Sequence, residues 1–237
     1  MLILGIGVLL SGSLFAQTSA FRSDWQSLNI LQTTDPIFPP QLLQLTVTEG
    51  EARVVINTDA TGKLIDWLVI GYTHREFADT AVVAIKQWKF EPARLQGEPV
   101  GTTTELSFYF EAKGVVVSSP NIIENLEGRL MRFLDGRYAY QPCSPQALDR
   151  MPTPVVTVAP RYSSQLAGNG VKGRIKIEFF IDETGAVRMP AASAADNAVL
   201  TSLAINALSQ WKFAPPTSKG RSVLVKAIQE FEFKNGS

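Results

Sequence analysis

The residues of this chain that could do chemistry are few and widely spaced. Asp59 and Asp182 stand in the same motif, Asp-x-Thr-Gly, and a pair of carboxylates can serve as general acid and base. The single histidine, His74, and the single cysteine, Cys143, have no ligand cluster or partner nucleophile in the sequence. We therefore expect no catalytic residue, no metal site, no cofactor and no enzymatic activity, and we assign both aspartates to turns.

Composition argues against a nucleic-acid partner. The 237 residues include 22 basic and 22 acidic side chains, and neither sign forms a long run. No overall field would therefore draw the chain to phosphate groups or to an anionic membrane. The hydrophobic content of 45% is ordinary for a globular protein, and the length suits one large domain or two small ones.

Residues 1–20 have the pattern of a secretory signal peptide. An apolar run from Met1 to about Leu10 precedes small residues, with Ala16 and Ala20 as cleavage positions, although no Lys or Arg comes before the run. Cleavage and export is one interpretation. A short uncleaved anchor is the other, and only that one implies membrane contact.

About sixty residues of the chain occur twice. "WKFEPARLQGEPV" begins at Trp88 and "WKFAPPTSKGRSV" begins at Trp211, and Asp59 and Asp182 share the same offset of 123 residues. A constant offset means that the two copies share loop lengths as well as side chains. The sequence therefore predicts two structural units of one kind.

Each copy opens with a predicted β-hairpin. In the turn, Asp59 and Asp182 can accept hydrogen bonds from their own backbone, and Gly62 and Gly185 can adopt a positive φ. The second strand of the first copy, around Trp67, is apolar on both faces. One helix covers one face only, so we expect the other face to pack on the second unit or on a second chain, which includes a homodimer.

A predicted amphipathic helix follows each hairpin and ends in Trp-Lys-Phe-x-Pro. We expect a capping box from Thr73 and Glu76 in the first copy and a cap from Asp196 in the second. The tryptophans complete an apolar stripe and are expected to be core anchors. The structural residues of the two helix ends are Trp88, Phe90, Pro92, Trp211, Phe213 and Pro215.

A final aromatic strand completes each unit as ββαβ. The crossover helix makes the second and third strands parallel, so the first strand fits between them and the sheet order is 2-1-3. The expected class is α+β, with three-stranded antiparallel sheets and one helix across a face. We predict domains over 35–113 and 158–237, joined by a linker over 114–157 with a short helix at 122–138 and extended segments.

This combination of motifs resembles the C-terminal domain of the TonB family. The resemblance covers about Asp35–Glu111 and Ala159–Phe233. It implies a small sheet with a helix across one face, a periplasmic location and no enzymatic activity. It also implies a partner, because the family's domain pairs its last strand with an extended segment of an outer-membrane transporter or binds other envelope proteins.

The resemblance suggests two groups of partner-binding residues. One group lies on the last strands, where exposed edges can accept another strand: Thr103, Glu105, Ser107 and Tyr109 in the first copy, and Ile228, Glu230 and Glu232 in the second. The other group is the N-terminal motif, a Tyr-Pro pair in the family, which here is Phe38-Pro39 in the first copy and Tyr162-Ser163 in the second. Because charge on an edge discourages pairing, we expect the first copy's edge to be the open one, unless "GVVVSS" or "PVVTVAP" caps an edge.

Three functions remain open at this point. The first is a periplasmic protein-binding module. The second is an inner-membrane-anchored energy transducer for TonB-dependent transport, although Gln17 to Asp35 is only nineteen residues and extends to about 63–68 Å. The third is an envelope scaffold whose edges are all capped.

Overall fold

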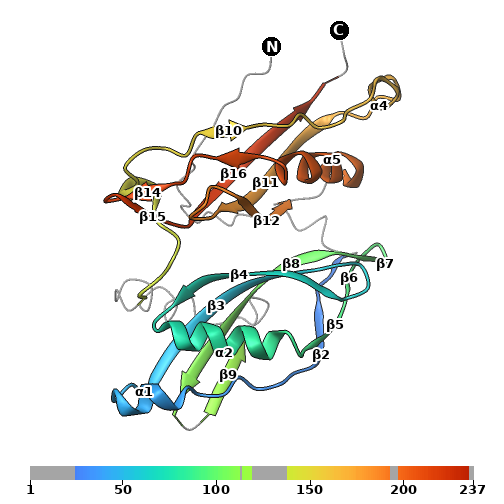
Figure 1. The fold of residues 1–237 in the computed structure, drawn as a ribbon. Coiled ribbons are helices and arrows are strands. Elements are labelled where there is room, and N and C mark those ends of the chain that lie inside the picture. The colour runs from blue at the N-terminus through green and yellow to red at the C-terminus, as the bar shows by residue number, and fades with distance from the viewer. Residues whose placement is uncertain (1–24, 113, 119–137, 193–196, 235–237) are drawn as a thin grey trace, which may run out of the picture. The chain divides into compact units, whose positions relative to one another are not determined.

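The structure, a computed structural model, describes residues 25–112, 114–118, 138–192 and 197–234. The chain divides between residues 141 and 142 into two compact units, named here the first unit and the second unit (Figure 1). The signal peptide predicted at residues 1–20 lies outside the described residues. So does the predicted linker helix, apart from Tyr138 at its end.

The first unit is a four-stranded antiparallel sheet in the order β4-β3-β8-β9, with α2 along one face (Figure 1). Short strands form two further small sheets, β1-β6-β7 and β2-β5. The elements in chain order are β1 (Trp25–Gln26), β2 (Asn29–Gln32), α1 (Pro40–Gln44), β3 (Glu49–Thr58), β4 (Leu64–Tyr72), α2 (Arg75–Ile85), β5 (Lys89–Glu91), β6 (Ala93–Leu95), β7 (Glu98–Val100), β8 (Thr102–Glu111) and β9 (Gly114–Ser118).

The second unit repeats this plan with a three-stranded sheet, β12-β11-β16, and α5 across one face. Two strand pairs, β10-β13 and β14-β15, complete it. Its elements are the 3₁₀ turn η1 (Pro145–Ala147), β10 (Pro154–Val156), α4 (Ser164–Gly168), β11 (Gly173–Ile181), β12 (Val187–Ala192), α5 (Ala198–Leu208), β13 (Lys212–Phe213), β14 (Thr217–Ser218), β15 (Arg221–Ser222) and β16 (Val225–Phe233). The prediction of two ββαβ units with the first strand at the centre is confirmed.

The segment predicted as a linker, residues 114–157, contributes to both units. β9 pairs with β8 from Ser107↔Ser118 to Glu111↔Gly114 and adds a fourth strand to the first sheet. In the second unit, β10 pairs with β13, and the Cys143 N–H donates to the Leu224 carbonyl at 2.7 Å. Extended chain next to an open sheet edge or strand satisfies its backbone groups by pairing, and β9 and β10 do so here.

The hairpin turns use the motif Asp-x-Thr-Gly in the same way in both units. The Asp59 carboxylate accepts bonds from the Thr61 hydroxyl at 2.6 Å, from the Thr61 N–H at 2.8 Å and from the Lys63 N–H at 3.0 Å. The bonds from Thr61 lower the pKa of Asp59. Asp182 accepts the matching set from Thr184 and Ala186.

Both turn positions need glycine for two reasons: the backbone φ is positive, and another backbone segment lies too close to leave room for a Cβ atom. Gly62 has φ of +82° and Gly185 has φ of +86°. A Cβ on Gly62 would collide with the backbone carbonyl of Phe90, and one on Gly185 would collide with that of Phe213. Each hairpin turn therefore rests on the backbone just after the helix-end tryptophan.

Each helix-end tryptophan is buried and hydrogen-bonded. Trp88 is 6% exposed and Trp211 is 4% exposed. The Trp88 Nε1–H donates to the Thr34 carbonyl at 2.8 Å, and the Trp211 Nε1–H donates to the Val158 carbonyl at 2.8 Å. The indoles thus tie the segment that precedes each hairpin to the core.

The helix N-termini differ from the prediction. Residue His74 caps α2 without a side-chain bond, and the Thr73 hydroxyl accepts from the Glu51 N–H at 3.0 Å instead. In α5 the cap is Asn197, whose side chain accepts from the Leu200 N–H at 3.0 Å, and Asp196 lies outside the described residues. The capping-box prediction was wrong because Thr73 is close enough to β3 to bond its backbone.

Trp67 lies on the helix side of the first sheet, opposite Ile56, with the Lys86 ammonium 4.4 Å from its ring centre. On the other face, Leu68 and Ile70 are buried and the Tyr138 ring lies next to Gly71. The packing of that face on the second unit or on a second chain stays a prediction.

We expect Trp88→Ala to destabilise the first unit by about 3–5 kcal/mol, because it removes a buried aromatic side chain and leaves the Thr34 carbonyl without its donor. Chemical denaturation followed by circular dichroism measures the change. Val83→Ala is the control, because Val83 is 59% exposed on the same helix. Its change should stay within about 0.5 kcal/mol. Equal midpoints for the two variants would contradict the core role of Trp88.

We expect Gly62→Ala to destabilise the first unit more than Gly97→Ala does. Both glycines have φ of +82°, but a Cβ on Gly97 meets nothing within 4 Å. Gly97→Ala should therefore show only the strain of a positive φ, about 1 kcal/mol, and Gly62→Ala should add a backbone collision. Denaturation midpoints compare the two variants, and equal losses would contradict the close packing of the turn.

Candidate functional site

The outer edge of β8 is half closed by the chain itself. β9 pairs with Ser107–Glu111, and Thr102–Leu106 has no strand partner on that side among the described residues. The expectation that the first copy offers the open edge therefore holds only for Thr102–Leu106. The alternative that "GVVVSS" caps an edge is what the structure shows.

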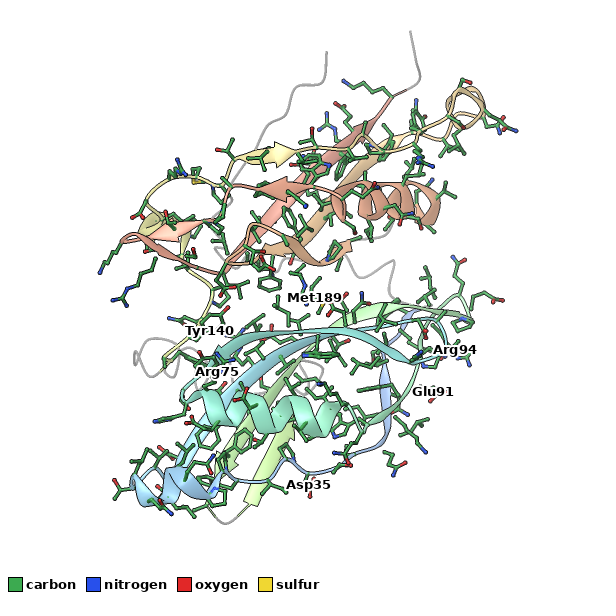
Figure 2. All side chains as sticks on the ribbon, in the orientation of Figure 1. Asp35, Arg75, Glu91, Arg94, Tyr140 and Met189 are labelled. Atoms are coloured by element: carbon green, nitrogen blue, oxygen red, sulfur yellow. The ribbon has the colours of Figure 1, made fainter. Side chains whose placement is uncertain are left out.

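Another part of the same unit covers one end of β4. The Tyr72 N–H donates to the Tyr140 carbonyl at 3.0 Å, and the two rings stack with centroids 5.1 Å apart. Tyr140 is labelled in Figure 2. The outer sides of β4 and β8 are thus each partly bonded by other backbone of the same unit.

The outer edge of β16 has no such cover in the described part of the second unit. β16 pairs with β11 at every position from Gly173↔Phe233 to Ile181↔Val225, and no described strand pairs with its other side. The part of β8 that pairs with β9, Ser107–Glu111, corresponds through the offset of 123 to positions 230–234 of the second unit. Within the described residues, the outward backbone N–H and C=O groups of β16 therefore have no neighbouring strand, and an added strand could pair with them.

The predicted residues of β16, Ile228, Glu230 and Glu232, lie on the sheet face away from α5. The two glutamates take part in an ion-pair ladder on that face. Glu232 pairs with Arg174 at 3.2 Å, Glu230 with Lys176 at 3.8 Å, and Lys226 with Glu178 at 2.7 Å. Bonds from Lys234 and Arg174 lower the pKa of Glu232. These pairs are partly exposed and individually weak, but cross-strand opposite charges favour the observed register.

The predicted residues of β8 lie on the equivalent face of the first sheet. Glu105 accepts from Arg53 Nη2 at 2.7 Å and from Arg53 Nε at 2.9 Å, and Ser107 lies opposite Arg53. Thr103 and Tyr109 lie opposite Asn57 and Glu51. Burial and a hydrogen bond with Glu51 raise the pKa of Tyr138 beside them.

The residues of the predicted N-terminal motif have internal contacts. Phe38 packs edge-on against Phe77 with centroids 5.3 Å apart, and Pro39 is the residue before α1. Tyr162 packs against Phe233 at 5.3 Å, and its hydroxyl donates to the Val171 carbonyl. The structure does not bring them together with the strand residues into one site.

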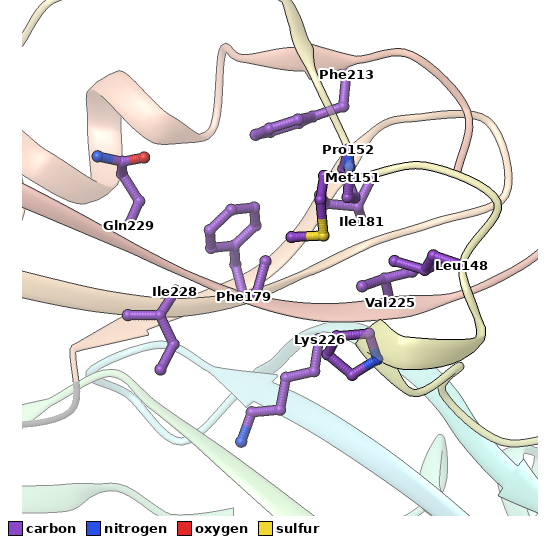
Figure 3. A pocket seen from close by; sticks show the side chains of 12 residues that line it. Leu148, Met151, Pro152, Phe179, Ile181, Phe213, Val225, Lys226, Ile228 and Gln229 are labelled. Carbon is purple, nitrogen blue, oxygen red and sulfur yellow. The ribbon is translucent and has the colours of Figure 1, made fainter. Parts of the chain in front are cut away.

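Sequence reasoning missed an apolar pocket beside the first half of β16 (Figure 3). The pocket is partly open to solvent. The lining residues come from four segments of the second unit: Pro145, Leu148, Met151 and Pro152; Phe179 and Ile181 on β11; Phe213 on β13; and Val225–Gln229 on β16. No local pattern signals it, because the first segment comes from the presumed linker.

Hydrogen bonds hold the linker-derived wall of the pocket in place. The Asp149 carboxylate accepts from the Lys219 N–H at 2.8 Å and from the Gly220 N–H at 2.9 Å, and these bonds lower its pKa. The Ser218 hydroxyl donates to the Ala147 carbonyl at 2.6 Å. The wall is therefore fastened to the β14-β15 hairpin on both sides of Leu148.

Within the part of the chain that the structure describes, no group of three or more His, Cys, Asp or Glu side chains could hold a metal ion. None of the helices in that part is long and apolar enough to cross a membrane.

Comparison with known proteins agrees with the repeat. Residues 36–112 and residues 158–235 each match the family model described as Gram-negative bacterial TonB protein C-terminal. No curated protein matches the chain. The family is non-catalytic, its domains generally act as protein-binding modules for outer-membrane transporters, and it suggests a location in the cell envelope. With both matches in register with the two ββαβ units, the chain belongs to the TonB C-terminal family and carries two tandem copies of its domain.

Proposed function

We propose that this chain is an exported, periplasmic protein-binding module. It accepts an extended segment of an envelope protein or outer-membrane transporter as an added strand on β16. The observation that carries the proposal is the difference between the two last strands: β9 occupies part of the β8 edge, whereas no described strand occupies the β16 edge. The proposed edge is therefore the second copy's, and not the first copy's as the charge pattern favoured.

Strand addition suits this edge energetically. An incoming segment would satisfy backbone groups along up to nine residues, Val225–Phe233, that are already held straight by β11. A preformed edge loses little conformational entropy on binding. The β8–β9 pairing shows that an edge of this kind, in the same protein, accepts an antiparallel segment rich in valine.

The first unit then serves a different purpose. With β9 in place, its sheet has four strands and a shorter free edge. We infer that the first unit does not bind the same kind of segment along the part of β8 that β9 covers. Cleavage of residues 1–20 and release into the periplasm belong to this proposal as well.

The test in the producing cell uses a photo-crosslinking amino acid at matched positions of the two units. Positions 230 and 232 on β16 correspond to positions 107 and 109 on β8, which β9 covers. We expect a cross-linked envelope protein from Glu230 and Glu232 and none from Ser107 and Tyr109. Cross-links from the β8 positions alone, or from neither pair, would overturn the assignment of β16.

Amide hydrogen exchange tests the state of the two edges in the isolated protein. On β16, the N–H groups that point away from β11 should exchange quickly, and the alternating ones should be protected. On β8, both sets should be protected within Ser107–Glu111, because β3 and β9 bond on either side. Uniform protection along β16 would mean that its edge is covered.

A further inference from the structure

We propose that the pocket beside β16 receives one bulky apolar side chain of the added strand, so that the second unit selects its peptide by that residue. The occupant is an extended segment of another protein with Leu, Ile, Met or Phe at the position opposite Ala227. This inference rests on the proposed function and adds a specificity to it.

Register places the pocket on the path of an added strand. Ala227 lies opposite Phe179, so the side chains of Val225, Ala227 and Gln229 lie on the helix side of the sheet, where the pocket is. Side chains directly opposite each other in an antiparallel pair share a face. A residue paired with Ala227 from the open side therefore faces the pocket, and the small alanine leaves room for it.

The lining defines the chemistry of the occupant. Phe179, Ile181 and Phe213 are buried and apolar, and Met151, on the opposite wall, is 45% exposed (Figure 3). The two polar lining groups are already engaged, because Lys226 pairs with Glu178 at 2.7 Å and the Gln229 amide donates to the Glu230 carbonyl at 2.7 Å. A charged or amide side chain would lose its hydration there without gaining a partner, whereas an apolar one gains by burial.

The wall that makes the pocket lies outside the second family match. Pro145, Leu148, Met151 and Pro152 precede the second family match, which begins at residue 158. The bonds from Ser218 to Ala147 and from the 219–220 backbone to Asp149 hold this segment beside the edge. The pocket therefore exists before a ligand arrives, which lowers the cost of ordering on binding.

The repeat also shows which peptide to use as a probe. Applied to β16 with the offset of 123, the β8–β9 register places Gly114 opposite position 234, and a residue seven places later opposite Ala227. The probes are labelled peptides Gly-Val-Val-Val-Ser-Ser-Thr-Xaa-Thr with Xaa as Ala, Leu, Phe or Lys. They begin with the β9 sequence and vary only the residue that would face the pocket.

Fluorescence anisotropy with the full chain measures their affinities. We expect the Leu and Phe peptides to bind about tenfold more tightly than the Ala peptide, because their side chains bury at least two more carbon groups in the pocket. The Lys peptide should bind no better than the Ala peptide. Ala227→Leu should fill the pocket and remove the difference between the Leu and Ala peptides. The matched change in the first unit, Thr104→Leu, should leave that difference intact.

Met151→Ala is the second variant, because Met151 is partly exposed and its loss should not prevent folding. It should weaken the Leu peptide several-fold and leave the Ala peptide unchanged. Equal affinity of all four peptides for the unmodified protein would overturn the pocket while leaving strand addition intact. Retention of binding by both of two Leu peptides, each N-methylated at one set of alternating amides, would overturn strand addition itself, because one of the two sets must bond the β16 edge. The absence of binding by every peptide would overturn both.

Discussion

The buried indole at the end of each helix holds the unit together. Trp88 and Trp211 pack their rings between helix and sheet, and each Nε1–H reaches back to the carbonyl of the segment that precedes the hairpin. Next to them, the hairpin glycines lie so close to the following backbone that no side chain fits. Helix, hairpin and lead-in segment therefore depend on one another, which explains why Trp-Lys-Phe and Asp-x-Thr-Gly occur together in both copies.

A sheet built on this plan leaves its last strand with one free edge, and the two units treat that edge differently. The first unit folds five residues of its own chain back onto β8. In the second, the ion pairs between β11 and β16 favour the register of the strand but do not cover its outer side. Among the described residues the two copies of one domain therefore differ at this edge: β9 pairs with part of β8, and no strand pairs with the outer side of β16.

The segment between the copies contributes to both outcomes. Its first residues supply β9, and its last residues supply the wall of the pocket and the strand β10. Neither element belongs to the matched family regions. The connection therefore adds structure to both copies from outside the matched regions.

The sequence alone determined the repeat, the hairpin turns, the helix stripes, the 2-1-3 strand order and the family, because these follow from local periodicity and from motifs within some sixty residues. It did not determine the N-terminal cap of α2, where the Thr73 hydroxyl accepts a hydrogen bond from the β3 backbone instead of capping the helix. It also did not determine which carbonyls accept from the tryptophan N–H groups. Nor could it decide which edge stays open, since "GVVVSS" has the same extended pattern whether or not it pairs. The pocket could not be predicted either, because its walls are distant in sequence and are brought together only by backbone hydrogen bonds that form in the folded unit.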